Sequence, residues 1–146
     1  MKEKGTTLII IDNALSWMDL ITKNTSLKYT GSFRVGTNWL GGVAFAKKHP
    51  LFNDLPVNQG LNWPYEAVVH NGNERLGFEM EGEELVAGSY HCFPQKLGTS
   101  VGVINCGKGK IIFSTLDICN NLHSNESTSA VAKKLLCNYI DFAELK

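Results

Sequence analysis

The sequence predicts an α/β domain, and three stretches carry this prediction. A continuous aliphatic run at residues 6–11 has the pattern of a buried strand, and a helical pattern follows it at once. A strand pair with a glycine-containing turn is indicated at residues 100–115, and the chain closes with a long amphipathic pattern. This mixture of elements is typical of an α/β chain.

The first strand and helix follow from the opening residues. The run TTLIII at residues 6–11 is aliphatic on both faces, so we expect a central strand of a sheet that helices cover on both sides. Asp12 and Asn13 then supply a side chain that can cap a helix, which is predicted to end near Lys23. Its predicted apolar stripe consists of Leu15, Trp17, Met18, Leu20 and Ile21.

The middle of the chain has weaker signals. Residues 25–42 are rich in Gly, Ser, Thr and Asn, which predicts a long loop or a lip beside a site. Residues 44–49 favour a short helix that stops before a proline. Residues 67–70, 76–80 and 84–90 have the composition of strands separated by turns.

The last third of the chain has clearer elements. VGVIN and KIIFS, joined by CGKG, predict a β-hairpin, because glycine accepts the positive φ of a tight turn. A helix is predicted over residues 127–144. Its predicted buried side consists of Ala130, Val131, Leu135, Leu136, Tyr139, Ile140 and Phe142.

Composition limits the classes of partner. The chain has 146 residues, which suits one domain spanning 1–146, and 14 basic residues balance 14 acidic ones. This balance favours neither disorder nor a nucleic-acid partner. No apolar run approaches the ~18 residues of a membrane span, and no signal peptide is recognised, so we expect a soluble chain without a membrane partner. A parent protein in the periplasm or outside the cell would be compatible with these features.

The cysteines and histidines do not form a ligand pattern. Cys92, Cys106, Cys119 and Cys137 fit no zinc or redox spacing, so they are interpreted mainly as small buried residues. The histidines also lack metal-ligand spacing. We therefore predict no metal and no cofactor. One alternative remains a thiol hydrolase that uses Cys92 or Cys119 with a histidine, His49 or His123.

The segment HPLFNDLPVNQGLNWPYEAVV, residues 49–69, combines aromatic, acidic and imidazole side chains with three prolines. Large aromatic side chains in loops can stack on sugars or anchor a partner, but they can equally plug the end of a sheet. The candidate substrate-binding residues are Trp39, His49, Trp63, Tyr65 and Glu66. The aromatic members would stack on a sugar ring, while Glu66 and His49 would bond its hydroxyl groups.

Three stretches together resemble class I glutamine amidotransferase-like domains: the segment at 49–69, GTTLIIIDNALSW and GKGKIIFSTLDICNNL. The similar domains are those of trehalose-utilisation-type proteins and those appended to β-galactosidase-type glycoside hydrolases. The resemblance implies a three-layer flavodoxin-like sheet with a β-hairpin and a C-terminal helix, or a truncated version of it. It also implies that the chain corresponds to the later part of a larger family domain.

The resemblance implies a role without catalysis by this chain. The nucleophilic cysteine of those enzymes lies on a strand-to-helix elbow in the earlier part of the domain, and no cysteine here has that context. The acids also show no facing pair of the kind a glycosidase needs. We therefore expect a non-catalytic accessory module of a carbohydrate-active glycoside hydrolase, acting in domain packing or in lining a sugar site.

The expected partners are other domains of a sugar hydrolase or a second copy of the chain, with carbohydrate as a further candidate. Two alternatives stay open: a small free-standing cysteine-dependent amidase or hydrolase, and a structural oligomerisation domain. The oligomerisation domain would require a large aromatic contact between chains.

Overall fold

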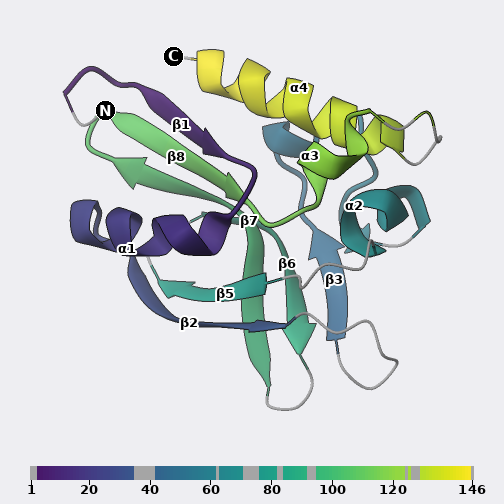
Figure 1. Ribbon diagram of the computed structural model, residues 1–146, viewed down its shortest axis with the longest axis horizontal. Helices are drawn as coiled ribbons and strands as arrows, with labels where there is room; N and C mark the ends of the chain where they lie inside the picture. The colour runs from purple at the N-terminus through teal and green to yellow at the C-terminus, as the bar shows by residue number, and fades with distance from the viewer. Residues whose placement is uncertain are drawn as a thin grey trace.

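The computed structural model describes residues 3–34, 42–61, 63–70, 76–81, 84–91, 95–123, 125 and 129–145. These residues form a mixed α/β structure, as predicted, with helices on both faces of one sheet (Figure 1). The strands are β1 (Thr7–Ile10), β2 (Lys28–Arg34), β3 (Gly42–Ala46), β4 (Gln59–Gly60), β5 (Leu76–Glu81), β6 (Glu84–His91), β7 (Lys96–Cys106) and β8 (Gly109–Ser114). The helices are α1 (Ala14–Asn24), α2 (Glu66–His70), α3 (Ile118–Asn121) and α4 (Ala130–Glu144), with short 3-10 turns η1 (Pro50–Phe52) and η2 (Trp63–Tyr65).

The strand order is β1-β8-β7-β6-β3-β4, and β5 joins β7 while β2 joins β5. β1 runs parallel to β8, whereas the other described pairs are antiparallel. A flavodoxin-like sheet is parallel in its core. The described strands therefore confirm the α/β class but not the flavodoxin-like arrangement.

β7 organises the sheet, because it pairs with β6 on one side and with β8 and β5 on the other. The predicted hairpin of β7 and β8 is confirmed, with Gly107 at a φ of 62° in its turn. β6 and β7 approach closely at Gly88, where a Cβ atom would lie 2.2 Å from the carbonyl oxygen of Gly98. Only glycine fits there without a shift of the backbone.

The sheet separates two apolar cores. One lies beneath α4 and includes Phe52, Tyr65, Ile112, Leu135 and Tyr139. The other lies beneath α1 and includes Met18, Ile21, Phe78, Ile104 and Phe113. Figure 1 shows β1 and β8 between these two helices.

The prediction that the first strand is central is wrong. β1 pairs with β8 alone among the described strands, and it lies at the end of the strand order. Its aliphatic side chains still pack on both faces, since Ile9 contacts the core beneath α4 and Leu8 and Ile10 contact the core beneath α1. Three of its four residues are only partly buried, because no described strand covers the second edge.

Three predictions in the middle of the chain are also wrong. Part of the expected loop at 25–42 is strand β2, which pairs with β5, while residues 35–41 lie outside the described residues. The expected helix at 44–49 is replaced by β3, because pairing with β6 outweighs the weak helical propensity. The expected strand at 67–70 is helix α2, whose Val68 and Val69 are buried.

Both long helices bury a different set of side chains from the predicted one. α1 buries Ala14, Met18 and Ile21, and it leaves three residues of the predicted stripe exposed: Leu15 at 45%, Trp17 at 39% and Leu20 at 52%. α4 buries Ala132, Leu135, Asn138 and Tyr139 rather than the full predicted stripe; Ile140 is 44% exposed. α3 was not predicted. No described helix is long and apolar enough to span a membrane.

Candidate functional site

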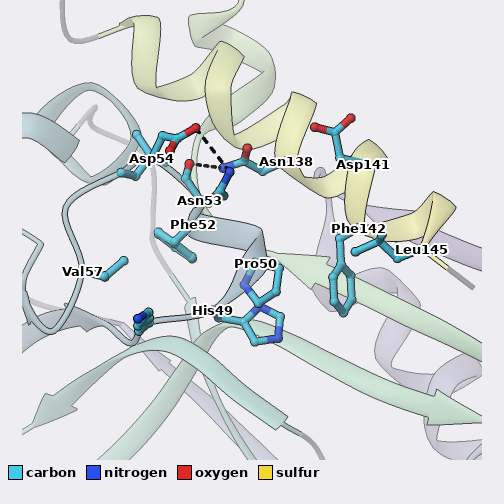
Figure 2. Close-up of a pocket in the computed structure, with 12 residues that line it drawn as sticks. His49, Pro50, Phe52, Asn53, Asp54, Val57, Asn138, Asp141, Phe142 and Leu145 are labelled. Carbon is cyan, nitrogen blue, oxygen red and sulfur yellow. Dashed lines mark hydrogen bonds between the residues drawn. The ribbon is translucent and has the colours of Figure 1, made fainter.

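A cleft of about 600 Å³ lies between the chain around η1 and the C-terminal part of α4 (Figure 2). Its walls include one predicted site residue, His49, together with Pro50, Asn138 and Phe142. This volume is within the range of small-molecule pockets, which is about 300–1,000 Å³. The cleft is therefore large enough to accept a ligand.

The position of His49 follows from the proline after it. His49 has extended backbone, with φ −157° and ψ 151°, as expected for a residue before proline. Its Nδ1 accepts a hydrogen bond from the backbone N–H of Leu51 at 3.1 Å, so the ring caps η1. Because Nδ1 is an acceptor, the proton of the neutral ring is assigned to Nε2, which lies 3.6 Å from Oε1 of Glu84.

Burial favours the neutral form of His49. Burial lowers the pKa of His49, and the positive charge of Lys110 lowers it further, whereas the carboxylate of Glu84 opposes both effects. The side chain is only 10% exposed, while that of Glu84 is 63% exposed, so solvent weakens the influence of Glu84. The cleft therefore contains a neutral imidazole with an N–H donor on Nε2.

Asn138 fixes the opposite wall of the cleft. Its side-chain amide donates to the carbonyl oxygens of Leu51 at 3.4 Å and of Asn53 at 2.8 Å, which ties α4 to the turn after η1. Only 3% of this residue is exposed. Sequence reasoning missed Asn138; the available signal was a polar residue three positions after Leu135, on the buried side of the helix.

Phe142 completes the floor of the cleft. Its ring centroid lies 5.1 Å from that of His49, and Nζ of Lys110 lies 4.8 Å from the ring centroid. Figure 2 shows the rings of Phe142 and His49 near each other beside Pro50. The charged residues of the lining are Lys48, Asp141 and Asp54, and Asp54 is already paired with Lys134 at 2.9 Å. The cleft thus suits a neutral polar ligand better than a strongly charged one.

The structure does not gather the other candidate residues at this cleft. Tyr65 is fully buried, and its hydroxyl donates to the carbonyl oxygen of Pro56, so it plugs the core. Burial raises the pKa of Tyr65 to about 12. Glu66 is exposed at the start of α2. Trp39 and the side chain of Trp63 lie outside the described residues.

Cys119 lacks the environment of a nucleophile. Burial raises the pKa of the Cys119 thiol, and the carboxylates of Asp12 and Asp117 raise it further. Catalytic thiols instead need a lowered pKa. Cys106 is buried, as expected, but Cys137 is exposed on α4, which corrects the general expectation of burial. Cys92 lies outside the described residues.

A second feature is an apolar surface beside the edge of β1 that pairs with no described strand. Trp17 and Leu20 of α1 are 39% and 52% exposed there. A groove of about 300 Å³ runs between α1 and the sheet, and its lining includes Trp17, Leu20, Leu8 and Ile111. We call Leu8, Trp17, Leu20 and the edge of β1 that pairs with no described strand the α1–β1 surface.

The comparisons with known proteins identify no family. A scan against protein-family models finds no match to this chain, and a search of curated proteins likewise finds none. Among the described residues, no group of three His, Cys, Asp or Glu side chains could hold a metal ion. The resemblance to amidotransferase-like domains therefore rests on the sequence stretches alone.

Proposed function

We propose that this chain is a non-catalytic accessory module of a carbohydrate-active glycoside hydrolase, and that it acts by packing against protein. The α1–β1 surface is the observation that carries the packing role. The assignment to a glycoside hydrolase, and to an amidotransferase-like domain of truncated flavodoxin-like type, is supported by the resemblance of the three sequence stretches.

The packing role follows from the energetics of α1. A helix with apolar side chains on most of its circumference is usually buried on more than one side. α1 buries Met18 and Ile21 in the core but exposes Trp17 and Leu20, which line the groove beside the sheet. Fully burying one such side chain is worth about 1.5–3 kcal/mol. Contact with a protein at this surface would therefore be favourable.

The surroundings of three acidic side chains support the absence of catalysis by this chain. Glu79 and Glu81 lie on β5, and each forms an ion pair with a lysine. Glu84 lies beside His49 rather than beside a second acid. A glycosidase instead needs two carboxyl groups placed across a sugar.

The packing proposal can be tested with a dye that binds exposed apolar surface, 8-anilinonaphthalene-1-sulfonate. We expect fluorescence enhancement with the wild-type chain and its loss in Leu20→Lys. Leu97→Lys is the matched control, because Leu97 on β7 is 51% exposed and Leu20 is 52% exposed. Equal dye binding by wild type and Leu20→Lys would contradict the proposal.

The absence of catalysis has a separate test. We expect no hydrolysis of chromogenic β-galactosides or of simple amides by the purified chain. Turnover that co-purifies with the wild-type chain and disappears in Cys92→Ala or Cys119→Ser would instead establish the thiol hydrolase.

A second candidate role, lining a sugar site, is favoured by the cleft at His49. We expect methyl β-D-galactopyranoside at millimolar concentration to shift the NMR signals of His49 and Phe142. Asp19→Asn on α1 serves as a control away from the cleft, and Asp141→Ala should weaken the response. If wild type gives no saturable shift, only the packing role remains.

A further inference from the structure

We propose that His49 is a pH-sensitive latch of the cleft: protonation of its Nδ1 ends the cap on η1 and releases Leu51 from the ring. The latch would work with or without a sugar in the cleft, so it goes beyond the proposed function. It uses the position of one imidazole ring among four elements, which are η1, β6, β8 and α4.

The neutral ring holds η1 through an acceptor that protonation removes. Nδ1 of His49 accepts the backbone N–H of Leu51 at 3.1 Å. An imidazolium carries a proton on both ring nitrogens and accepts no hydrogen bond. Leu51 is fully buried, so water does not replace the lost acceptor, and two donors would then face each other. The cap and the charged ring therefore exclude each other.

The charged ring has a second partner on its other side. Nε2 of His49 lies 3.6 Å from Oε1 of Glu84 on β6, which is too long for a hydrogen bond. Protonation adds attraction between opposite charges, and a charge-assisted bond would shorten this contact to about 2.8 Å. His49 thus has two arrangements: a neutral ring that caps η1 and a charged ring that pairs with Glu84.

Two charged residues tune the pH at which the arrangement changes. Burial lowers the pKa of His49, Glu84 raises it, and Lys110 of β8 lowers it. Nζ of Lys110 lies over the ring of Phe142, and that ring contacts His49 from α4. A charged His49 would therefore place a second cation beside the same aromatic ring.

The other charged residues of the cleft lining are exposed; they are Lys48, Asp54 and Asp141. Asp54 is paired with Lys134 on α4. Solvent weakens the influence of exposed charges on a buried ring. Glu84 and Lys110 are therefore the residues whose substitution should move the latch.

Leu51 passes the change on to the wall of the cleft, because it is held from two sides. His49 accepts its N–H, and the amide of Asn138 donates to its carbonyl oxygen at 3.4 Å. This second bond is already long and would weaken if Leu51 moved. The bond from Asn138 to Asn53 at 2.8 Å would keep α4 attached. We therefore expect protonation to loosen η1 locally without unfolding the domain.

Two NMR measurements on the whole chain test the latch. The nitrogen chemical shifts of the His49 ring show which nitrogen carries the proton, and hydrogen exchange of the Leu51 amide reports the cap. At neutral pH we expect the proton on Nε2 and a protected Leu51 amide. As His49 becomes charged, Leu51 should lose about tenfold more protection than Ile112, after correction for the intrinsic exchange rate. Ile112 is paired with both β1 and β7, so its amide reports global opening.

Variants should move the latch in opposite directions. Glu84→Gln should lower the pH at which Leu51 is released, because the charged ring loses its partner, and Lys110→Gln should raise it. Lys23→Gln removes the same charge at the end of α1 and is the control, which should leave the release unchanged. His49→Asn keeps an acceptor but does not titrate, so Leu51 should stay protected as the pH falls.

Several results would overturn the latch. They are a proton on Nδ1 at neutral pH, equal loss of protection at Leu51 and Ile112, titration of His49 that leaves Leu51 protected, and release of Leu51 in His49→Asn. A shift of the release in the same direction by Glu84→Gln and Lys110→Gln would also contradict it. The packing and sugar-site roles keep their own tests, because none of these measurements uses a partner, a dye or a sugar.

Discussion

Asn138 is a single polar residue on which the geometry of the cleft depends. It lies on the buried side of α4, where the periodic pattern of the sequence favours apolar residues. Its side chain is the described donor that joins α4 to the carbonyl groups of Leu51 and Asn53. Hydrophobic periodicity could predict the helix but not this bond, because the bond depends on a chain segment about 85 residues away in sequence.

We expect Asn138→Ala to lower the free energy of unfolding by about 1–3 kcal/mol, because two buried carbonyl groups lose their donor. Urea denaturation measures the change. Cys137→Ala, at the adjacent exposed position, is the control and should be nearly neutral. Equal stability of Asn138→Ala and wild type would show that the two bonds contribute nothing net.

His49 predicts a pH dependence of stability. Its pKa in the folded chain is lower than the usual 6.5, because burial disfavours the imidazolium. Well above pH 6.5 both folded and unfolded chains have a neutral imidazole and the group contributes nothing. As the pH falls through 6.5 the unfolded chain binds the proton first, so the free energy of unfolding decreases until the pH passes the folded pKa.

The measurement is urea denaturation of wild type and His49→Asn between neutral and mildly acidic pH. Asparagine can still accept the hydrogen bond from the N–H of Leu51 but does not titrate. As the pH falls, we expect the free energy of unfolding to decrease more in wild type than in His49→Asn. A constant difference would contradict the neutral, buried state of His49.

At the scale of elements, α1 shows what sequence periodicity predicts and what it does not. The helix and its end near Lys23 follow from the sequence, and α1 spans Ala14–Asn24. The sequence does not predict which side of α1 is buried, because apolar residues lie on both sides of the helix and either side could face the sheet. The same limit applies to β3 and α2, whose short segments take the conformation that their neighbours in the fold impose.

The two sides of α1 should respond differently to truncation. Met18 is 1% exposed, so Met18→Ala should lower the free energy of unfolding by about 2–5 kcal/mol. Leu20→Ala should change the free energy of unfolding of the monomer by at most about 0.5 kcal/mol, since Leu20 is 52% exposed. Thermal and urea denaturation at low protein concentration measure the change in unfolding free energy of each variant. A large loss in Leu20→Ala would mean that this side chain already packs within one chain.

At the scale of the whole molecule, the sequence predicted the class and the clearest elements but not the arrangement of the strands. The hairpin of β7 and β8 was predictable because its partners are adjacent in sequence. The pairing of β1 with β8 was not, because it joins Thr7 to Lys110. Of the cleft, the sequence predicted only His49 as a site residue. Asn138 and Phe142 could not be associated with it, because they lie on α4, far from His49 in sequence.

The three described cysteines, Cys106, Cys119 and Cys137, differ in burial and give a test of the packing. In a Cys92→Ala background at neutral pH, we expect a thiol reagent to modify Cys137 first, because it is exposed on α4. Cys119 should react more slowly, because burial raises its pKa, and Cys106 should react only on unfolding. Peptide mass spectrometry after timed labelling gives the order. Rapid modification of Cys119 would contradict its environment and support the thiol hydrolase.

The parallel pair of β1 and β8 has a consequence for the order in which the chain can mature on the ribosome. Because translation proceeds at about 5–20 residues per second, the segment that pairs with Thr7 is made many seconds after it. During that interval β1 can contact α1 but lacks its strand partner β8, so its aliphatic segment is available to chaperones or to other nascent chains. Slow or paused translation before Lys110 should therefore increase aggregation more than a pause placed after Ser114.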